Sequence, residues 1–201
     1  MPGRLIPVTR LSYGTGRPAV LKDDESIADC RYLLRHPLAL DDDMRLVSTV
    51  ELIRIRERVH NQLSPLEGPV LPAHFEYIQD AERHFDLWYK TWDHAFSMKW
   101  PDAGTSASFV ASVPPSHPSP AFYRQSLQIQ QIHAQLFHNA TVLRGINGEE
   151  DVEKMPKAQR DLAIRSIQIA RKGLDITVHS PSYREGMKYG QCHSVESRSG
   201  A

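Results

Sequence analysis

The sequence has little cysteine and no excess of charge of either sign. Only Cys30 and Cys192 occur in 201 residues, which excludes a disulfide scaffold and any all-cysteine zinc cluster. Lysine and arginine together number 24, as do aspartate and glutamate, so the formal net charge is zero. Modules that bind nucleic acids or membrane surfaces usually need a positive excess, and the charge balance therefore argues against both.

Long apolar runs are also missing. No uninterrupted apolar segment approaches the ~20 residues that span a bilayer, and the N-terminal segment holds no run long enough for a secretory signal. Hydrophobic residues (40%) and charged residues (24%) lie in the range of globular proteins. From composition we expect a soluble, intracellular, globular chain.

Apolar residues recur at helical spacing in four segments, whereas no segment alternates polar and apolar residues as a strand would. Acidic residues precede the first segment and a proline opens the last, as is typical of helix starts. The sequence therefore predicts an all-α fold of several helices packed in layers. The predicted helices span Met44–Leu63, Ala73–Phe96, Ala121–Ile146 and Pro156–Thr177.

The second predicted helix has the clearest apolar face, and that face is aromatic. At 100° per residue, six of its side chains fall within about 80° of arc. Such a face offers a large area for burial, so core packing is preferred over a ligand-binding role. The six residues are Ile78, Ala81, Phe85, Trp88, Trp92 and Phe96.

Two other helices carry more apolar residues than a single contact would bury. The first predicted helix has two apolar stripes roughly on opposite sides, so we expect it to lie between neighbours. The fourth has two adjoining stripes that together span about half its circumference, which again predicts more than one neighbour. These adjoining stripes are Leu162, Ile169 and Ile176, and Ala163, Ile167, Ala170 and Leu174.

The composition changes between and after these helices. Residues 97–120 contain several prolines and many small residues, which predicts a flexible Pro/Ser-rich insert. The stretch GEEDVEKMP at 148–156 indicates an acidic linker, and SYREGMKY at 182–189 a short turn. Residues 190–201 have no periodicity, so we predict a disordered tail.

One group of side chains has the spacing of a metal site. Glu76, Asp80 and His84 lie at i, i+4 and i+8, so a helix would present them on one face. Two carboxylates and an imidazole can bind a hard or borderline metal ion. However, no matching ExxH or HExxH motif occurs on another helix. A solvated charged face is therefore the preferred interpretation, and no metal site is predicted.

Other chemical motifs are weaker still. Gly14 and Gly16 lie in a glycine-containing turn, but they are only two residues apart, no lysine follows, and Pro18 removes a backbone donor. No G-x-S-x-G elbow occurs, and neither cysteine has a recognisable catalytic setting. No helix-turn-helix, zinc-finger or basic-zipper signature is present, so direct DNA contact is not expected. We predict no catalytic or cofactor-binding residues and no enzyme activity.

The most specific information is a series of longer runs. In order, GTGRP, DDES, HPL, RLVSTVEL and RERVHNQLSP occur within Ser12–Pro65. The segments HFEYIQDAERHFDLWYKTWD and AIRSIQIARKGLDITVHSPSYREGMKYG follow. Together these runs resemble the fungal-specific transcription factor domain. This domain is the middle homology, or regulatory, region of fungal zinc-cluster transcription factors. The similarity is to the branch of the leucine-biosynthesis regulator and the secreted-protease activators.

The resemblance implies an all-α regulatory domain that acts in the nucleus and recruits or restrains the RNA polymerase II transcription machinery. Some relatives respond to small metabolites through this region, so a small-molecule effector is implied as well. No effector-site residue can be carried over onto this sequence. In full-length relatives zinc is bound by an N-terminal cluster of six cysteines, and two cysteines are too few for it. We therefore expect no cofactor here.

The runs also suggest how the chain is organised. We interpret residues 1–189 as the C-terminal part of such a regulatory domain, with the flexible insert 97–120, and residues 190–201 as a tail. On this interpretation the chain is a fragment of a regulator without its DNA-binding module. Two alternatives stay open: a helical protein-interaction scaffold with no transcriptional output, and a small metal-dependent enzyme that uses Glu76, Asp80 and His84.

Overall fold

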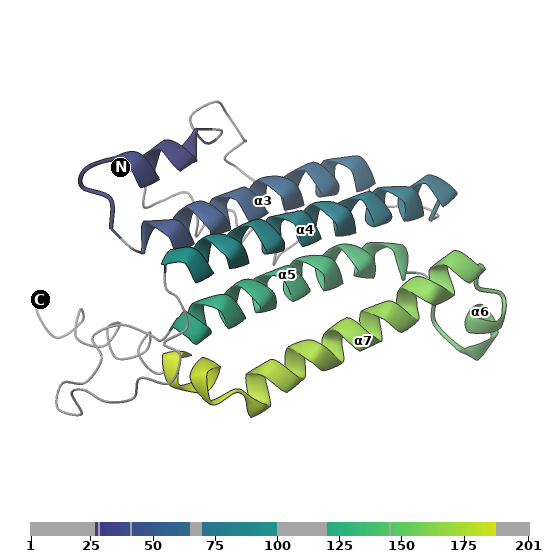
Figure 1. The fold of residues 1–201 in the computed structure, drawn as a ribbon. Coiled ribbons are helices and arrows are strands. Elements are labelled where there is room, and N and C mark those ends of the chain that lie inside the picture. The colour runs from purple at the N-terminus through teal and green to yellow at the C-terminus, as the bar shows by residue number, and fades with distance from the viewer. Residues whose placement is uncertain are drawn as a thin grey trace, which may run out of the picture. The chain divides into compact units, whose positions relative to one another are not determined.

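The computed structural model describes residues 27, 29–40, 42–64, 70–99, 120–144 and 146–187. Every regular element in these ranges is helical, so the all-α prediction is confirmed (Figure 1). The chain divides into two compact units, residues 1–58 and 59–201. The elements are η2 (Cys30–Arg35), α3 (Asp43–Leu63), α4 (Pro72–Lys99), α5 (Pro120–Val142), α6 (Glu149–Glu153) and α7 (Lys157–His179), followed by a short helix over 181–187.

The first unit contains η2 and most of α3. The guanidinium of Arg31 in η2 binds the Glu51 carboxylate of α3 through two donors, one of them at 2.9 Å. At the start of α3, the carboxylate of Asp43 accepts a hydrogen bond of 2.8 Å from the backbone N–H of Leu40. This carboxylate supports the turn that leads into α3, as the acidic residues before the predicted helix suggest. Within this unit η2 is thus tied to α3 by charge.

Helix α3 begins in the first unit and ends in the second. Val47 and Leu52 are buried in the first unit, and Val59 and Leu63 in the second. Leu52, Val59 and Leu63 lie on one of the two predicted apolar stripes, which is thus largely buried. The other stripe consists of Leu46, Val47, Val50 and Ile53, and of these only Val47 is buried.

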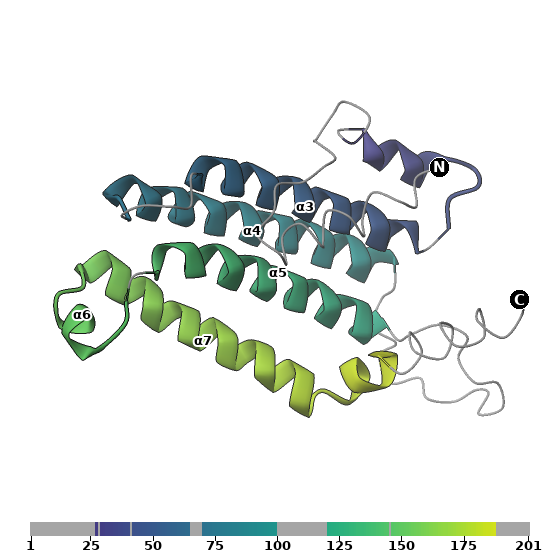
Figure 2. The same cartoon turned by 180° about the vertical axis from the view of Figure 1, so that it is seen from behind.

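The second unit is built on α4, α5 and α7. Helix α5 packs against α4 on one side and against α7 on the other, and the three lie side by side (Figures 1 and 2). The buried residues of α4 are the six of the predicted aromatic face, so the core prediction is confirmed. The ring of Phe96 stacks on Tyr123 of α5 with centroids 6.4 Å apart, and Phe85 stacks on the imidazole of His138 at 5.8 Å.

Polar contacts fix how α4 lies along α5. The Arg124 guanidinium binds the Asp93 carboxylate with two hydrogen bonds of 2.8 and 3.2 Å. Two turns further along, the amide of Gln131 donates to the Asp86 carboxylate at 2.6 Å. Both contacts are partly buried, where charge-assisted hydrogen bonds are stronger than in water. They therefore define one register between the two helices.

The contact between α5 and α7 also includes polar groups. The buried amide of Asn139 donates to the Ser166 hydroxyl at 3.0 Å. The Gln159 amide donates to the backbone carbonyl of Val142 at 2.7 Å and so satisfies a free group at the end of α5. The short helix 181–187 lies against the start of α5, where a Cβ added to Gly186 would be 2.1 Å from the ring of Phe122.

The boundaries of the predicted insert need correction. Residues 97–120 were expected to form a flexible insert, but Ser97–Lys99 continue α4 and Pro120 opens α5. The Ser97 hydroxyl donates to the carbonyl of Asp93 at 2.7 Å, a bond along the helix that is compatible with its continuation. Residues 100–119 and the predicted tail 190–201 lie outside the described residues.

Two connections also differ from the prediction. Helix α5 ends at Val142 and not at residue 146. The acidic segment 148–156, predicted as a linker, contains the short helix α6. Its first turn consists of Glu149, Glu150 and Asp151, and such carboxylates are stabilised by the positive end of the helix dipole. The expected turn after Ser180 is likewise a helix, over 181–187.

Truncation of Trp88 tests the packing of α4. Trp88 is only 4% exposed, so Trp88→Ala is expected to lower the free energy of unfolding by about 3–5 kcal/mol through lost burial and the remaining cavity. Leu87→Ala, at the next position but 64% exposed, is the matched control and should cost less than about 0.5 kcal/mol. Urea denaturation followed by circular dichroism measures both. Equal costs would contradict the burial of this face.

Candidate functional site

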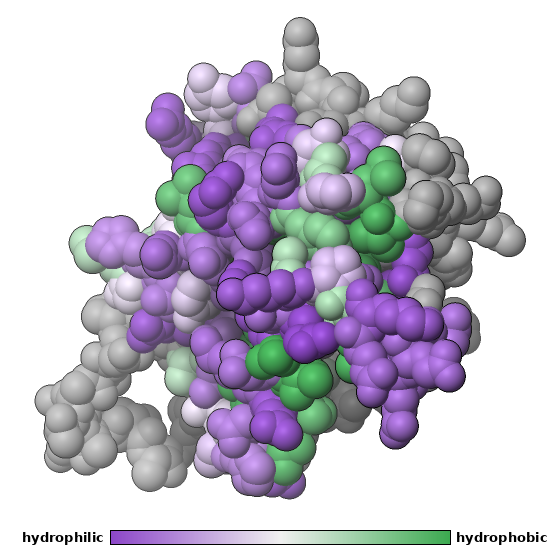
Figure 3. Space-filling model, turned by 90° about the vertical axis from the view of Figure 1, so that its right-hand side faces the viewer, coloured by the Kyte–Doolittle hydropathy of each residue, from purple (hydrophilic) through white to green (hydrophobic). Residues whose placement is uncertain are grey.

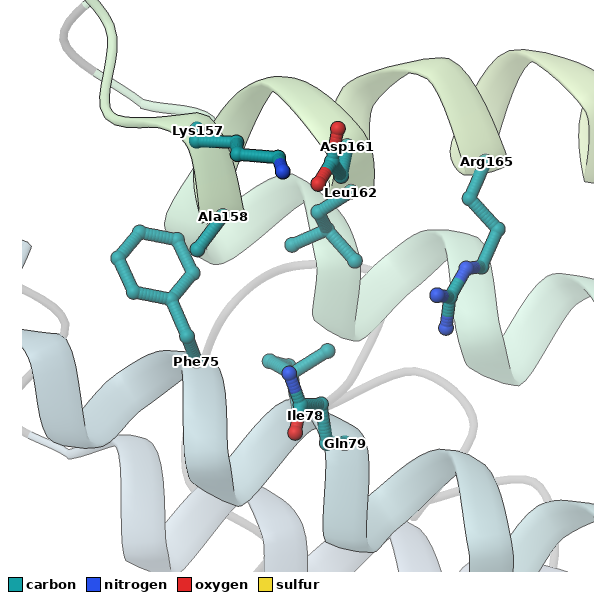
Figure 4. A pocket seen from close by; sticks show the side chains of 8 residues that line it. All are labelled: Phe75, Ile78, Gln79, Lys157, Ala158, Asp161, Leu162 and Arg165. Atoms are coloured by element: carbon teal, nitrogen blue, oxygen red, sulfur yellow. The ribbon is translucent and has the colours of Figure 1, made fainter.

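The main candidate site is a pocket between the first halves of α4 and α7 (Figure 4). Its volume is about 420 Å³, within the range of small-molecule sites. Helix α4 supplies one wall and α7 the other, because both helices pack on α5. The lining residues are Phe75, Ile78, Gln79, Lys157, Ala158, Asp161, Leu162 and Arg165.

The floor of the pocket is apolar. Ile78 of α4 and Leu162 of α7 are buried and point toward each other across the gap (Figure 4). The ring of Phe75 faces the methyl group of Ala158 at one end (Figure 4). These four side chains offer a surface that an alkyl or aromatic group can cover.

The rim of the pocket is charged. Lys157, Asp161 and Arg165 follow one another at four-residue spacing on α7, so they share one face of the helix. The Arg165 side chain extends from α7 toward α4 (Figure 4). There its guanidinium forms an ion pair with the carboxylate of Glu82.

Glu82 is the least solvated charged group near the pocket. Its side chain is only 12% exposed. The oxygen Oε1 is buried and accepts no hydrogen bond within the described part of the chain. Burial raises the pKa of Glu82 above its ordinary value of 4.5, and the attraction of Arg165 offsets this only in part. Desolvation therefore destabilises the ionised form of this carboxylate beside the pocket.

The described lining of the pocket combines an apolar floor with charged groups at the rim. Lys157 and Asp161 face the rim from α7, and the Arg165 charge is already paired with Glu82. The floor suits the apolar part of a small molecule, and the Lys157 ammonium suits an acidic group on it.

The structure does not gather Glu76, Asp80 and His84 into a metal site. Asp80 binds the Arg83 guanidinium at 2.9 Å, and the His84 Nδ1 lies 2.9 Å from the Asp80 carbonyl oxygen. Within the described ranges, no group of three histidine, cysteine, aspartate or glutamate side chains is placed to hold a metal ion. The geometry thus gives no support to the metal-dependent alternative.

The other motifs singled out in the sequence are the glycine-containing turn and the two cysteines. The glycine-containing turn at 12–18 and Cys192 lie outside the described residues. Cys30 lies in the first unit, where it is buried. The pKa of its thiol is raised by burial and, to a smaller extent, by the Glu51 carboxylate. A raised pKa lowers the fraction of thiolate, which is the nucleophilic form, at neutral pH.

Sequence analysis assigned no residue to the pocket. Glu82 and Arg165 are 83 positions apart, and no local pattern links them. The spacing of Lys157, Asp161 and Arg165 is visible in the sequence, but solvated helix faces commonly share it. The site becomes apparent only when α5 holds α4 and α7 together.

None of the described helices is long and apolar enough to cross a lipid bilayer. On the face viewed in Figure 3, hydrophilic side chains predominate among the described residues, and hydrophobic ones lie between them in separate groups. Comparison of the chain with protein-family models, with curated proteins and with solved structures gives no match.

Replacement of Glu82 tests the electrostatics beside the pocket. Because its pKa is raised by folding, Glu82 favours the folded state below pH 4.5, and this contribution is lost as the pH rises through the raised pKa. Glu82→Gln stays neutral at every pH. We therefore expect the variant to be more stable than the wild type at pH 7 and its stability to change less between pH 4.5 and 7.

Urea denaturation over that pH interval measures the effect. Glu76→Gln removes an exposed carboxylate from the same helix and is the control. Lower stability of Glu82→Gln at pH 7 would show that the ion pair with Arg165 outweighs desolvation, which contradicts the prediction.

Proposed function

We propose that the chain is part of the regulatory region of a transcription factor of the fungal zinc-cluster type. It acts in the nucleus on transcription by RNA polymerase II, without DNA contacts of its own. The observation that carries the proposal is the order and length of the runs that resemble that region, from GTGRP to SYREGMKYG. An all-α chain is what this resemblance requires, and α3, α4 and α7 fulfil that requirement.

The helices also support the proposal by their positions. The run RLVSTVEL lies within α3, and HFEYIQDAERHFDLWYKTWD lies within α4. The last run begins inside α7 and continues into the helix 181–187. Three of the resembling runs thus lie mainly on helices, whereas HPL lies in the turn between η2 and α3, and GTGRP and DDES lie outside the described residues.

We place the effector of this proposal in the pocket between α4 and α7. Its apolar floor and the Lys157 ammonium at its rim suit a small molecule with an acidic group. A ligand seated there would contact both helices and alter how firmly they are held together. The proposal therefore includes regulation by a small molecule.

A tethering experiment tests the transcriptional role. The full chain is fused to a heterologous DNA-binding domain and assayed in yeast on a silent reporter and on an active one, so that activation and repression are both visible. We expect expression from one of the two reporters to change at least about threefold. Smaller changes correspond to well under 1 kcal/mol and are too small to assign to the chain. Trp88→Ala, which weakens the core, should abolish the change, and Leu87→Ala should retain it. Unchanged expression from both reporters, with the fusion present and folded, would contradict the proposal.

A helical interaction scaffold without transcriptional output is the second candidate. The observation that favours it is a set of large aliphatic side chains exposed on one side of α7. The two candidates differ in the reporter assay. A scaffold would bind its partner while leaving both reporters unchanged.

A further inference from the structure

The outer side of α7 carries four aliphatic side chains that lie largely in solvent. Ile164, Ile167, Leu174 and Val178 are 52%, 56%, 64% and 54% exposed. At 100° and 1.5 Å per residue, they fall within about 80° of arc and extend over roughly 20 Å. They therefore share a single face of the helix, as two pairs with Arg171 between them, and we name these four side chains the α7 stripe.

The opposite side of α7 is held firmly. Leu162, Ser166 and Gly173 are buried there, and Ser166 accepts a hydrogen bond from Asn139 of α5. A Cβ added to Gly173 would lie 3.1 Å from a methyl carbon of Ile132, so the two helices approach closely. Because α7 is anchored along this side, the α7 stripe is presented on an ordered helix and not on a loose end.

The stripe is an apolar surface of moderate size. Full burial of one aliphatic side chain removes roughly 60–120 Å² from water. Four side chains that are just over half exposed therefore leave roughly 140–270 Å² of apolar area. The largest apolar patch on a typical monomer measures about 300–600 Å² and is often functional, so the stripe approaches that size.

The charges around the stripe indicate what covers it. Arg171 is exposed in the middle of the stripe, and Lys172 lies farther round the helix. The exposed Asp175 lies at the edge of the stripe, one turn after Arg171 and 3.0 Å from the Nδ1 of His179. A cation at the centre of an apolar surface favours a partner that places a carboxylate opposite it.

A second copy of the chain fits this pattern poorly. Ile164 and Val178 lie seven residues before and after Arg171, Ile167 lies four residues before it, and Leu174 lies three residues after it. Two antiparallel copies of α7 would thus match their aliphatic residues. They would also bring the two Arg171 side chains together at the two-fold axis, where the like charges repel.

We propose that the α7 stripe docks an acidic amphipathic helix of a partner protein. Aliphatic residues of that helix, spaced three, four and seven apart, pack on the stripe, and its carboxylates face Arg171 and Lys172. This partner class goes beyond the proposed function, because it follows from the surface of α7 whether or not the chain affects transcription.

A labelled synthetic peptide tests the docking directly. The probe is a peptide of about 16 residues, long enough to match the stripe, with leucines at helical spacing and glutamates beside them. Three such peptides, with the leucine pattern moved by one residue each time, are titrated with the full chain and followed by fluorescence anisotropy. We expect at least one to bind with a Kd in the micromolar range and to bind more weakly as salt is added.

Substitutions on exposed positions locate the site without loss of folding. The double variant Ile167→Ser with Leu174→Ser should weaken binding about tenfold or more. Arg171→Glu should weaken it about fivefold, and a probe with lysines in place of glutamates should bind this variant better than it binds the wild type. Leu87→Ser, which exchanges an equally exposed leucine on α4, is the matched control and should leave the Kd unchanged.

Several outcomes would overturn the proposal. One is that none of the peptides binds when the chain is present at about 1 mM, because a Kd above this concentration is too weak for specific docking. Another is that binding survives the double variant, which would place the peptide elsewhere. Concentration-dependent dimers in sedimentation that disappear in the double variant would assign the stripe to a second copy. Binding to anionic phosphatidylserine vesicles that is lost in the same variant would assign it to a membrane surface.

Discussion

The burial of the aromatic face of α4 against α5 is the constraint on which the second unit depends. Large aromatic side chains stabilise a fold most when they are fully removed from water, and α4 carries four of them on one face. Helix α7 packs on α5 from its other side, so α5 is the central helix of the three. Its buried residues accordingly come from all around its circumference: Phe122, Tyr123, Leu127, Ile129, Ile132, Ala134, His138 and Val142.

A helix enclosed in this way must also find partners for its polar groups. Gln131 of α5 meets Asp86 of α4, and Asn139 meets Ser166 of α7. Each contact is satisfied at only one position along the neighbouring helix, because hydrogen bonds depend strongly on distance and direction. The start of α7 is thereby held beside α4, where Arg165 reaches Glu82. The pocket is a consequence of the register that α5 imposes on its two neighbours.

Much of this architecture could be predicted from the sequence, because helical periodicity is a local signal. The aromatic face of α4 was predicted residue by residue, and the starts of the four long helices were placed within one residue. The local sequence pattern was insufficient where contacts with other parts of the chain determine the structure. Helix α6 was taken for a linker since five acidic-rich residues carry no periodicity of their own. The pocket could not be predicted at all, because the ion pair at its edge joins residues 83 positions apart.

Helix α7 shows that periodicity predicts an apolar face but does not identify what covers it. Its wide apolar arc predicted more than one neighbour, yet the neighbours in the described chain leave Ile167 and Leu174 exposed. Burial of about 140–270 Å² is worth roughly 3–7 kcal/mol, which is no more than the 4–15 kcal/mol that association itself costs. Apolar contact alone therefore gives a weak complex at best. The charge at Arg171 then decides between partners, because it opposes a second copy and attracts a carboxylate.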